Sequence, residues 1–138
     1  MRYLRLEPNA DIPLYDGPEP FAAIVAIEAD VTREWQWQVS KWLVDSGCLY
    51  MLAWGRDCSS WDDSVDYAIL ETFNYGDIPE ERDVMTTWHE NETLSEVFDF
   101  VKRHMKPASD TVQLRDTVQL HISAIEKGQQ YALLFAAA

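Results

Sequence analysis

Four short apolar runs alternate with amphipathic segments along most of the chain. Two of these runs, residues 21–27 and 48–54, are apolar throughout, which is typical of strands covered on both faces of a sheet. Residues 83–88 and 117–122 have the length and composition of two further strands. Before them, the proline-rich residues 1–20 predict an extended N-terminal arm that can add a short edge strand.

The segments between these runs carry apolar residues at helical spacing. In the first of them, Asp30 or Thr32 can cap the start of a helix, and Gly47 is suited to its end. The predicted helices cover residues 32–46, 61–74, 93–105 and 125–138.

Two capping-box patterns predict where the second and third helices begin. Ser60 with Asp63 forms one pattern, and Thr93 with Glu96 forms the other. Strands that alternate with helices predict an α/β fold, namely a three-layer sandwich around a mainly parallel sheet of four to five strands. We expect the strand order to be Rossmann-like or flavodoxin-like, with residues 21–138 forming a single domain behind the arm.

Composition narrows the function classes. The chain has 138 residues, 47% of them hydrophobic, and a formal net charge of −13, which disfavours binding to a nucleic-acid backbone. No apolar run approaches the ~18 residues of a membrane-spanning helix, and no glycine-rich phosphate loop indicates a nucleotide cofactor. Cys48 and Cys58 form no metal or redox motif. We therefore expect no cofactor, no metal, no membrane contact and a cytoplasmic location.

The residues that follow each predicted strand are the first functional candidates, because ligands of parallel sheets bind beyond the carboxyl ends of the strands. Asp57, Cys58, His89 and Glu90 follow the second and third strands and are candidate catalytic residues. A cysteine at a helix N-terminus can be a thiolate nucleophile, with a histidine as base and Asp57 or Glu90 to orient it. With Glu28 after the first strand, they predict one shared cleft, without a direct hydrogen bond between Cys58 and His89.

The charge is concentrated in residues 57–96, which hold twelve acids and one base, a net charge of −11. Asp62, Asp63 and Asp66 crowd one face of the predicted second helix, where like charges repel each other. One explanation is a solvated face that only keeps the protein soluble. The other is a surface that steers and binds a basic protein partner.

Aromatic residues lie beside this acidic segment. Trp61 and Tyr67 are predicted anchors for a partner, and Arg56 and Glu28 complete the candidate binding residues. Trp37 faces away from the apolar stripe of its helix, so either the N-terminal arm or a second subunit covers it. A homodimer is therefore left open.

Two stretches of the chain resemble known families. Residues 28–32 (EADVT) resemble the DxDxT motif of haloacid-dehalogenase-type phosphatases, but glutamate stands where that family has its nucleophilic aspartate. Residues 52–63 (LAWGRDCSSWDD), taken with residues 84–90 (VMTTWHE), resemble a small bacterial family of single-domain proteins of unknown function. That resemblance covers roughly residues 20–125. It implies a bacterial cytoplasmic α/β protein and attaches no activity or site residues to it.

Two function classes follow from these observations. The first is a small acidic cytoplasmic binding protein, in the manner of acidic inhibitor proteins, with a basic protein as its partner. The second is a small hydrolase or transferase that uses the strand-end cleft at Asp57, Cys58 and His89. The sequence does not decide whether the protein is an enzyme.

Overall fold

A computed structural model describes residues 1–138 and shows five parallel strands in one sheet. The strands are β1 (Arg2–Leu6), β2 (Phe21–Ile27), β3 (Cys48–Gly55), β4 (Met85–His89) and β5 (Asp116–Ile122). Their spatial order is β1-β5-β2-β3-β4. The predicted parallel sheet is confirmed, including the extra strand from the N-terminal arm, which pairs with β5.

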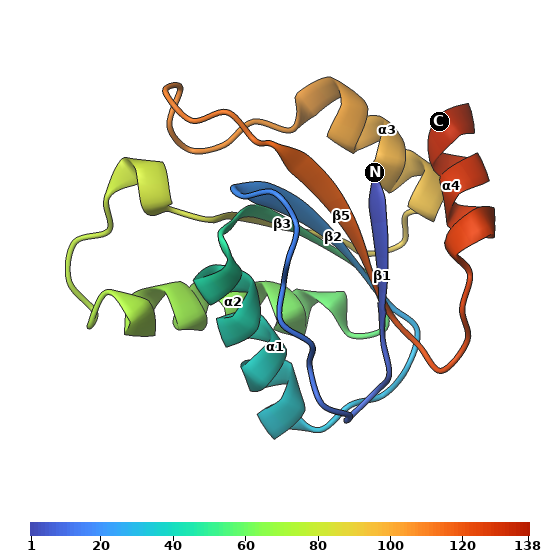
Figure 1. Ribbon diagram of the computed structural model, residues 1–138, viewed down its shortest axis with the longest axis horizontal. Helices are drawn as coiled ribbons and strands as arrows, with labels where there is room; N and C mark the ends of the chain where they lie inside the picture. Colours follow the sequence, from blue (N-terminus) through green and yellow to red (C-terminus); the bar gives the residue numbers. More distant parts are fainter.

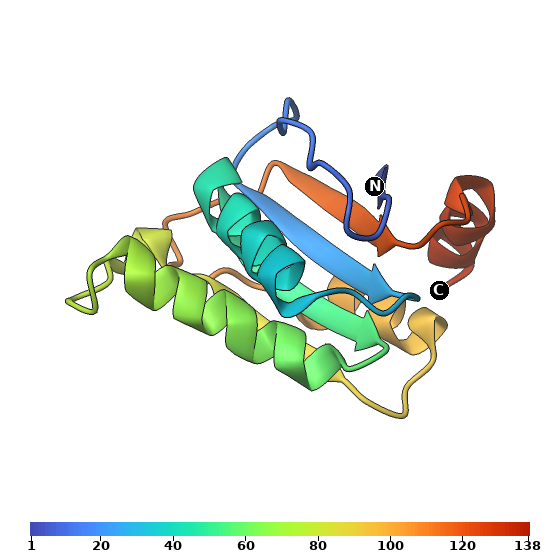
Figure 2. The same ribbon diagram turned by 90° about the horizontal axis from the view of Figure 1, so that it is seen from below.

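Four helices cover the two faces of the sheet. They are α1 (Arg33–Ser46), α2 (Cys58–Thr72), α3 (Leu94–His104) and α4 (Gly128–Ala137), with a short 3-10 turn at Glu80–Arg82. Figure 1 shows α3 and α4 on one side of the sheet, and Figure 2 shows α1 and α2 lying across the other side. One apolar core lies under each pair of helices, so the predicted three-layer sandwich is confirmed.

The topology locates the point where ligands of such folds usually bind. Counted from β2, the strands β2 to β5 stand in the order 3-2-1-4, which is that of the Rossmann fold. The chain leaves β2 for α1 on one face and leaves β5 for α4 on the other. The carboxyl ends of β2 and β5 therefore flank the topological switch point of the sheet.

Local signals set both ends of α1 and the start of α3. Thr32 caps α1 by accepting a hydrogen bond from the backbone N–H of Trp35, and Gly47 ends that helix in the left-handed conformation. The predicted capping box of Thr93 and Glu96 is present at the start of α3. These contacts satisfy backbone groups that would otherwise lack partners at the helix ends.

The predicted start of α2 is wrong. The helix begins at Cys58 rather than at Trp61, and Asp57 occupies the cap position in the left-handed conformation without a side-chain cap bond. Ser60 donates to Asp57 instead of forming a capping box with Asp63. Gly55 causes the earlier start, because its left-handed φ of 102° turns the chain over the end of β2, where any side chain would strike the Ile27 carbonyl.

The arm between β1 and β2 crosses the face of the sheet that carries α1. The indole N–H of Trp35 donates to the carbonyl of Ala10, and the Tyr15 ring stacks on Phe21. Trp37 is half-buried and shares a groove with Leu14 and Tyr15 of the arm. The arm therefore contributes to covering this side of α1.

Candidate functional site

An open pocket of about 390 Å³ lies beyond the carboxyl ends of β3 and β4. Asp57, Cys58, His89 and Glu90 all line it, because β3 and β4 are neighbouring strands whose following loops emerge side by side. Glu28 does not line this pocket and lies instead at the switch point. The structure thus brings together the candidate catalytic residues and separates them from Glu28.

Cys58 is the first residue of α2 and is buried. Burial raises the pKa of its thiol, and this effect exceeds the opposing contribution of the His89 backbone N–H. A thiolate nucleophile requires a lowered pKa, so this environment works against the predicted role of Cys58. Cys48 is also a free, buried thiol, and burial raises its pKa to about 12.

Both ring nitrogens of His89 are engaged within its own segment. Nδ1 lies 2.5 Å from a carboxylate oxygen of Glu92, and Nε2 lies 2.9 Å from the Thr87 hydroxyl. The predicted orienting acids were Asp57 and Glu90, but Glu92 takes this position because the turn after β4 folds it back over the imidazole. His89 would have to release Thr87 before it could accept a proton from another group.

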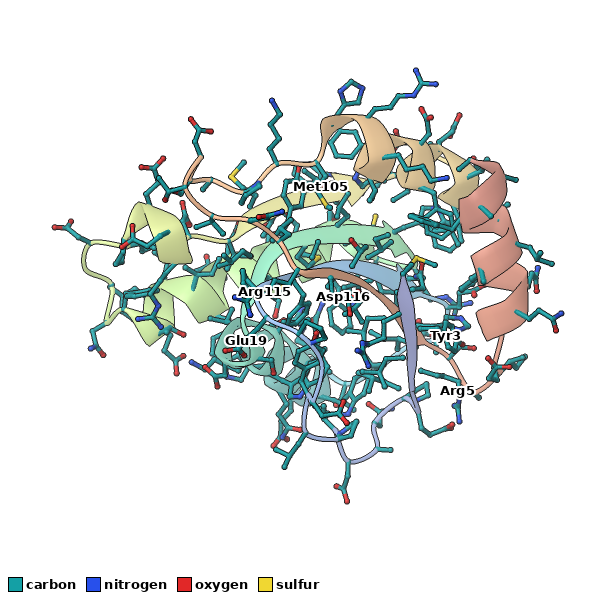
Figure 3. The ribbon with its side chains drawn as sticks, turned by 45° about the horizontal axis from the view of Figure 1, so that its top comes forward. Tyr3, Arg5, Glu19, Met105, Arg115 and Asp116 are labelled. Atoms are coloured by element: carbon teal, nitrogen blue, oxygen red, sulfur yellow. The ribbon has the colours of Figure 1, made fainter.

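A second polar cluster, the Glu28 network, lies at the switch point. It consists of Tyr3 on β1, Glu28 after β2, His121 on β5, and Lys127 and Tyr131 at the start of α4. Figure 3 labels Tyr3 on β1, beside α4. Sequence analysis noted Glu28 as a strand-end residue and missed Tyr3, Lys127 and Tyr131, which come from the two ends of the chain.

One arrangement of protons satisfies the hydrogen bonds of this network. The Tyr3 oxygen accepts from the backbone N–H of Lys127, so its single proton is free to point at His121 Nδ1, 2.7 Å away. His121 is then neutral, with its proton on Nε2, which donates to Glu28 Oε1 at 2.8 Å. Tyr131 and Lys127 donate to the same carboxylate. Each polar group therefore has a complementary partner.

The two central pKa values follow from this arrangement. Burial alone would raise the pKa of Glu28, but the bonds from Tyr131, His121 and Lys127 hold it below its usual range. Burial lowers the pKa of His121, because its ring is 0% exposed and an imidazolium there would lose its hydration. The network ties β1, β2, β5 and α4 together and fills the switch point with protein side chains.

A third cluster, the Asp62–Asp66 pair, lies between α2 and the edge strand β4. Thr86 on β4 donates to Asp66 at 2.8 Å, whereas the buried Oδ1 of Asp62 has no hydrogen-bond partner. Asp62 is only 6% exposed, and burial raises the pKa of both carboxyls. Neighbouring carboxylates, including Asp63, raise them further. Ionised carboxylates are therefore held here at a cost in stability.

The surroundings of the pair differ from what the sequence predicted. Trp61 is 2% exposed and packs in the core, so it cannot anchor a partner. Because α2 begins at Cys58, Trp61 lies within its first turn and faces inward. Tyr67 is exposed, as is Trp88 on β4, which is 51% exposed. Arg56 pairs with Asp30 across the neighbouring loops.

The acidic segment is almost free of ion pairs. No lysine or arginine pairs with any acid of residues 57–96, and the only contact of this kind there is the hydrogen bond between His89 and Glu92. Outside this segment, four cations pair with acids: Arg2 with Asp116, Arg5 with Glu7, Arg103 with Asp99, and Lys127 with Glu28. None of the twelve acids of this segment therefore has a lysine or arginine partner.

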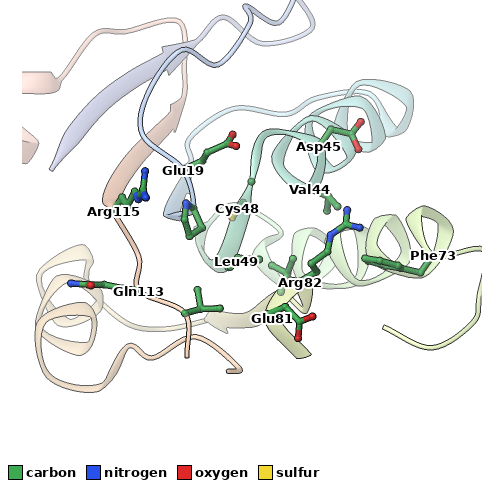
Figure 4. Close-up of a pocket in the computed structure, with 14 residues that line it drawn as sticks. Glu19, Val44, Asp45, Cys48, Leu49, Phe73, Glu81, Arg82, Gln113 and Arg115 are labelled. Atoms are coloured by element: carbon green, nitrogen blue, oxygen red, sulfur yellow. The ribbon is translucent and has the colours of Figure 1, made fainter. Parts of the chain in front are cut away.

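A further pocket of about 610 Å³ opens at the opposite, amino-terminal edge of the sheet. Figure 4 shows Arg82 and Arg115 on two sides of it, with the apolar residues Val44 and Leu49 between them. Arg82 lies over the ring of Phe73, 4.7 Å from its centre. Ligand sites of parallel sheets usually lie at the other edge, beyond the carboxyl ends of the strands.

No group of three or more histidine, cysteine or acidic side chains is arranged to hold a metal ion. None of the helices has both the length and the apolar character needed to cross a membrane.

The chain belongs to the family described as Domain of unknown function (DUF7684), which matches it over residues 1–138. No curated protein and no solved structure matches it. The expected membership in a single-domain α/β family of unknown function is confirmed, and a bacterial origin stays a prediction.

Proposed function

We propose that this protein is a small acidic binding protein that holds a basic protein partner on α2 and β4. One observation carries the proposal: the Asp62–Asp66 pair holds a buried and an exposed carboxyl side by side without a cation, and the buried Oδ1 of Asp62 has no hydrogen-bond partner. A protein gains no stability from such an arrangement. A partner's ammonium or guanidinium group beside the exposed Asp66 would offset the repulsion between the two carboxylates.

The surrounding surface supports the same partner chemistry. Unpaired acids of residues 57–96 would raise the encounter rate with a basic protein, and exposed aromatic rings such as Trp88 are typical anchors in interfaces. We propose the cytoplasm as the compartment, since Cys48 and Cys58 are free thiols. The net charge of −13 favours a protein partner over nucleic acid.

The test uses short polylysine peptides as the basic probe and calorimetry at ~50 mM and ~500 mM salt. We expect the double variant Asp62→Asn/Asp66→Asn to bind about tenfold more weakly than wild type at low salt. The matched control, Asp11→Asn/Asp110→Asn, removes the same charge from exposed positions outside α2 and β4. Equal weakening in both double variants would contradict the proposal, because binding would then depend on net charge alone.

A small hydrolase or transferase at the β3–β4 pocket is the second candidate. It is favoured by the shared lining of Asp57, Cys58 and His89, and weakened by the raised pKa of the Cys58 thiol. An activated thiol would react with iodoacetamide at pH 7 faster than free cysteine does. We expect the reverse for Cys58, with alkylation at least about tenfold slower than for free cysteine. Faster alkylation would restore the enzyme hypothesis.

A further inference from the structure

We propose that the basic partner binds as an additional strand along the outer edge of β4, with one of its cationic side chains over the Asp62–Asp66 pair. This inference rests on the proposed function and specifies its binding mode. The occupant is an extended segment of a basic protein. Strand addition of this kind combines main-chain hydrogen bonds with side-chain contacts on alternate residues.

The backbone of β4 is available for such an addition. β4 pairs with β3 on one side only and is the last strand of the sheet. Proteins usually protect such edges with lysine, proline, a bulge or other charged residues. The other edge strand, β1, carries Arg2 and Arg5, whereas β4 reads Met-Thr-Thr-Trp-His and has none of these devices. The exposed Met85 and Trp88 add apolar surface to this edge.

The side chains of β4 show where a partner's cation would lie. Thr86 and Trp88 share one face of the strand, the face that packs toward α2, because side chains alternate along a strand. A strand added ~4.8 Å beyond β4 would project every second side chain toward the same face. A long cationic side chain there can pair with the exposed carboxylate of Asp66 beside Thr86 and lie against the Trp88 ring.

Charge argues against a second copy of this chain as the occupant. Two β4 edges in contact would bring together two segments that each carry a net charge of −11. Their repulsion would oppose pairing, and neither copy would supply a lysine or arginine from this surface except Arg82. Edge pairing between copies is therefore an outcome that would overturn the inference.

The probe is an eight-residue peptide in which arginine and valine alternate, prepared in three forms. One is unmodified, one is N-methylated on the valines and one is N-methylated on the arginines. On an added strand, only alternate amides face β4, so methylation of one set breaks the ladder while methylation of the other leaves it intact. We expect one methylated form to bind at least about tenfold more weakly than the unmodified peptide, and the other to keep its affinity.

Amide hydrogen exchange of the full protein gives the second readout. The unmodified peptide should slow exchange at outward-facing amides of residues 85–89 and leave β1 amides unchanged. If both methylated forms bind like the unmodified peptide, with no protection in β4, strand addition is overturned and the acidic docking surface stands. If the peptides bind the double variant Asp62→Asn/Asp66→Asn as well as wild type, the proposed function fails too. A concentration-dependent dimer that protects β4 without peptide also overturns the inference.

Discussion

The Glu28 network and the Asp62–Asp66 pair place acids in opposite electrostatic environments within one domain. Glu28 accepts hydrogen bonds from three side chains, and its pKa is lowered. Asp62 has an unpartnered oxygen, and burial together with neighbouring acids raises the pKa of both members of the pair. The first arrangement stabilises the fold, while the second costs stability and is consistent with a site that an external cation completes.

The largest effect should follow from Glu28→Gln. The amide keeps the shape but loses the charge and turns a donor toward Lys127, so the free energy of unfolding should fall by about 2 kcal/mol. Urea denaturation measures this change. The control Asp30→Asn alters an exposed surface pair and should cost less than about 0.5 kcal/mol. Equal effects of the two variants would mean that the network is not a stabilising unit.

The two regions should also respond to pH with opposite signs. Folding lowers the pKa values of His121 and Glu28, so both groups stabilise the folded state at neutral pH. His121 loses this stabilisation as pH falls below about 6.5, and Glu28 loses it as pH falls below about 4.5. Asp62 and Asp66 have raised pKa values, so they regain stability as pH falls and they become protonated. In the variant Asp62→Asn/Asp66→Asn, the loss of stability between pH 6.5 and 4 should therefore be steeper than in wild type, as urea titrations at each pH would show.

A smaller change of the opposite sign is expected for Asp62→Asn alone. Removal of one buried charge relieves repulsion, and the new amide can donate to Asp66 one helical turn away, so unfolding should cost about 0.5 kcal/mol more. Thermal denaturation at pH 7 would detect this as a raised midpoint. A lower midpoint would show that the Asp62 carboxylate contributes to the fold, and the contrast with Glu28 would disappear.

The smallest effect on stability is expected for Trp88→Lys. The ring is 51% exposed, so the free energy of unfolding should stay within about 0.5 kcal/mol of wild type. Binding of the arginine–valine peptide should nevertheless fall strongly, because the substitution places a positive charge on the proposed docking edge. Unchanged binding would exclude Trp88 and its edge from the interface.

Much of the fold could be predicted from short stretches of sequence, because apolar runs and capping residues determine where several strands and helices lie. The apolar run 21–27 coincides with β2, and the capping box at Thr93 fixes the start of α3. The start of α2 was misplaced because the turn at Gly55 depends on the close approach of β2, which no local pattern reveals. The prediction of Trp61 as an anchor for a partner was wrong for the same reason, because the face of the helix on which Trp61 lies depends on where α2 begins.

The candidate sites were predicted only in part, for a related reason. Asp57, Cys58 and His89 line one pocket, as the sequence indicated, because each lies at the carboxyl end of a strand and the ends of adjacent parallel strands meet. The Glu28 network joins residues more than a hundred positions apart in sequence, such as Tyr3 and Lys127. The position of Glu28 after β2 could indicate a site, but only the strand order shows that its partners come from β1 and α4.

The place of β5 in the sheet has a consequence for how the chain folds during synthesis. β5 lies between β1 and β2, so β1 has no strand partner until β5 is made, and β2 is paired on one side only, with β3. Until β5 emerges from the ribosome, one side of the buried strand β2 is an open edge. Completion of the sheet therefore depends on the strand that is synthesised last, and it joins segments that are far apart in sequence. Nascent chains halted before residue 116 should accordingly remain sensitive to protease.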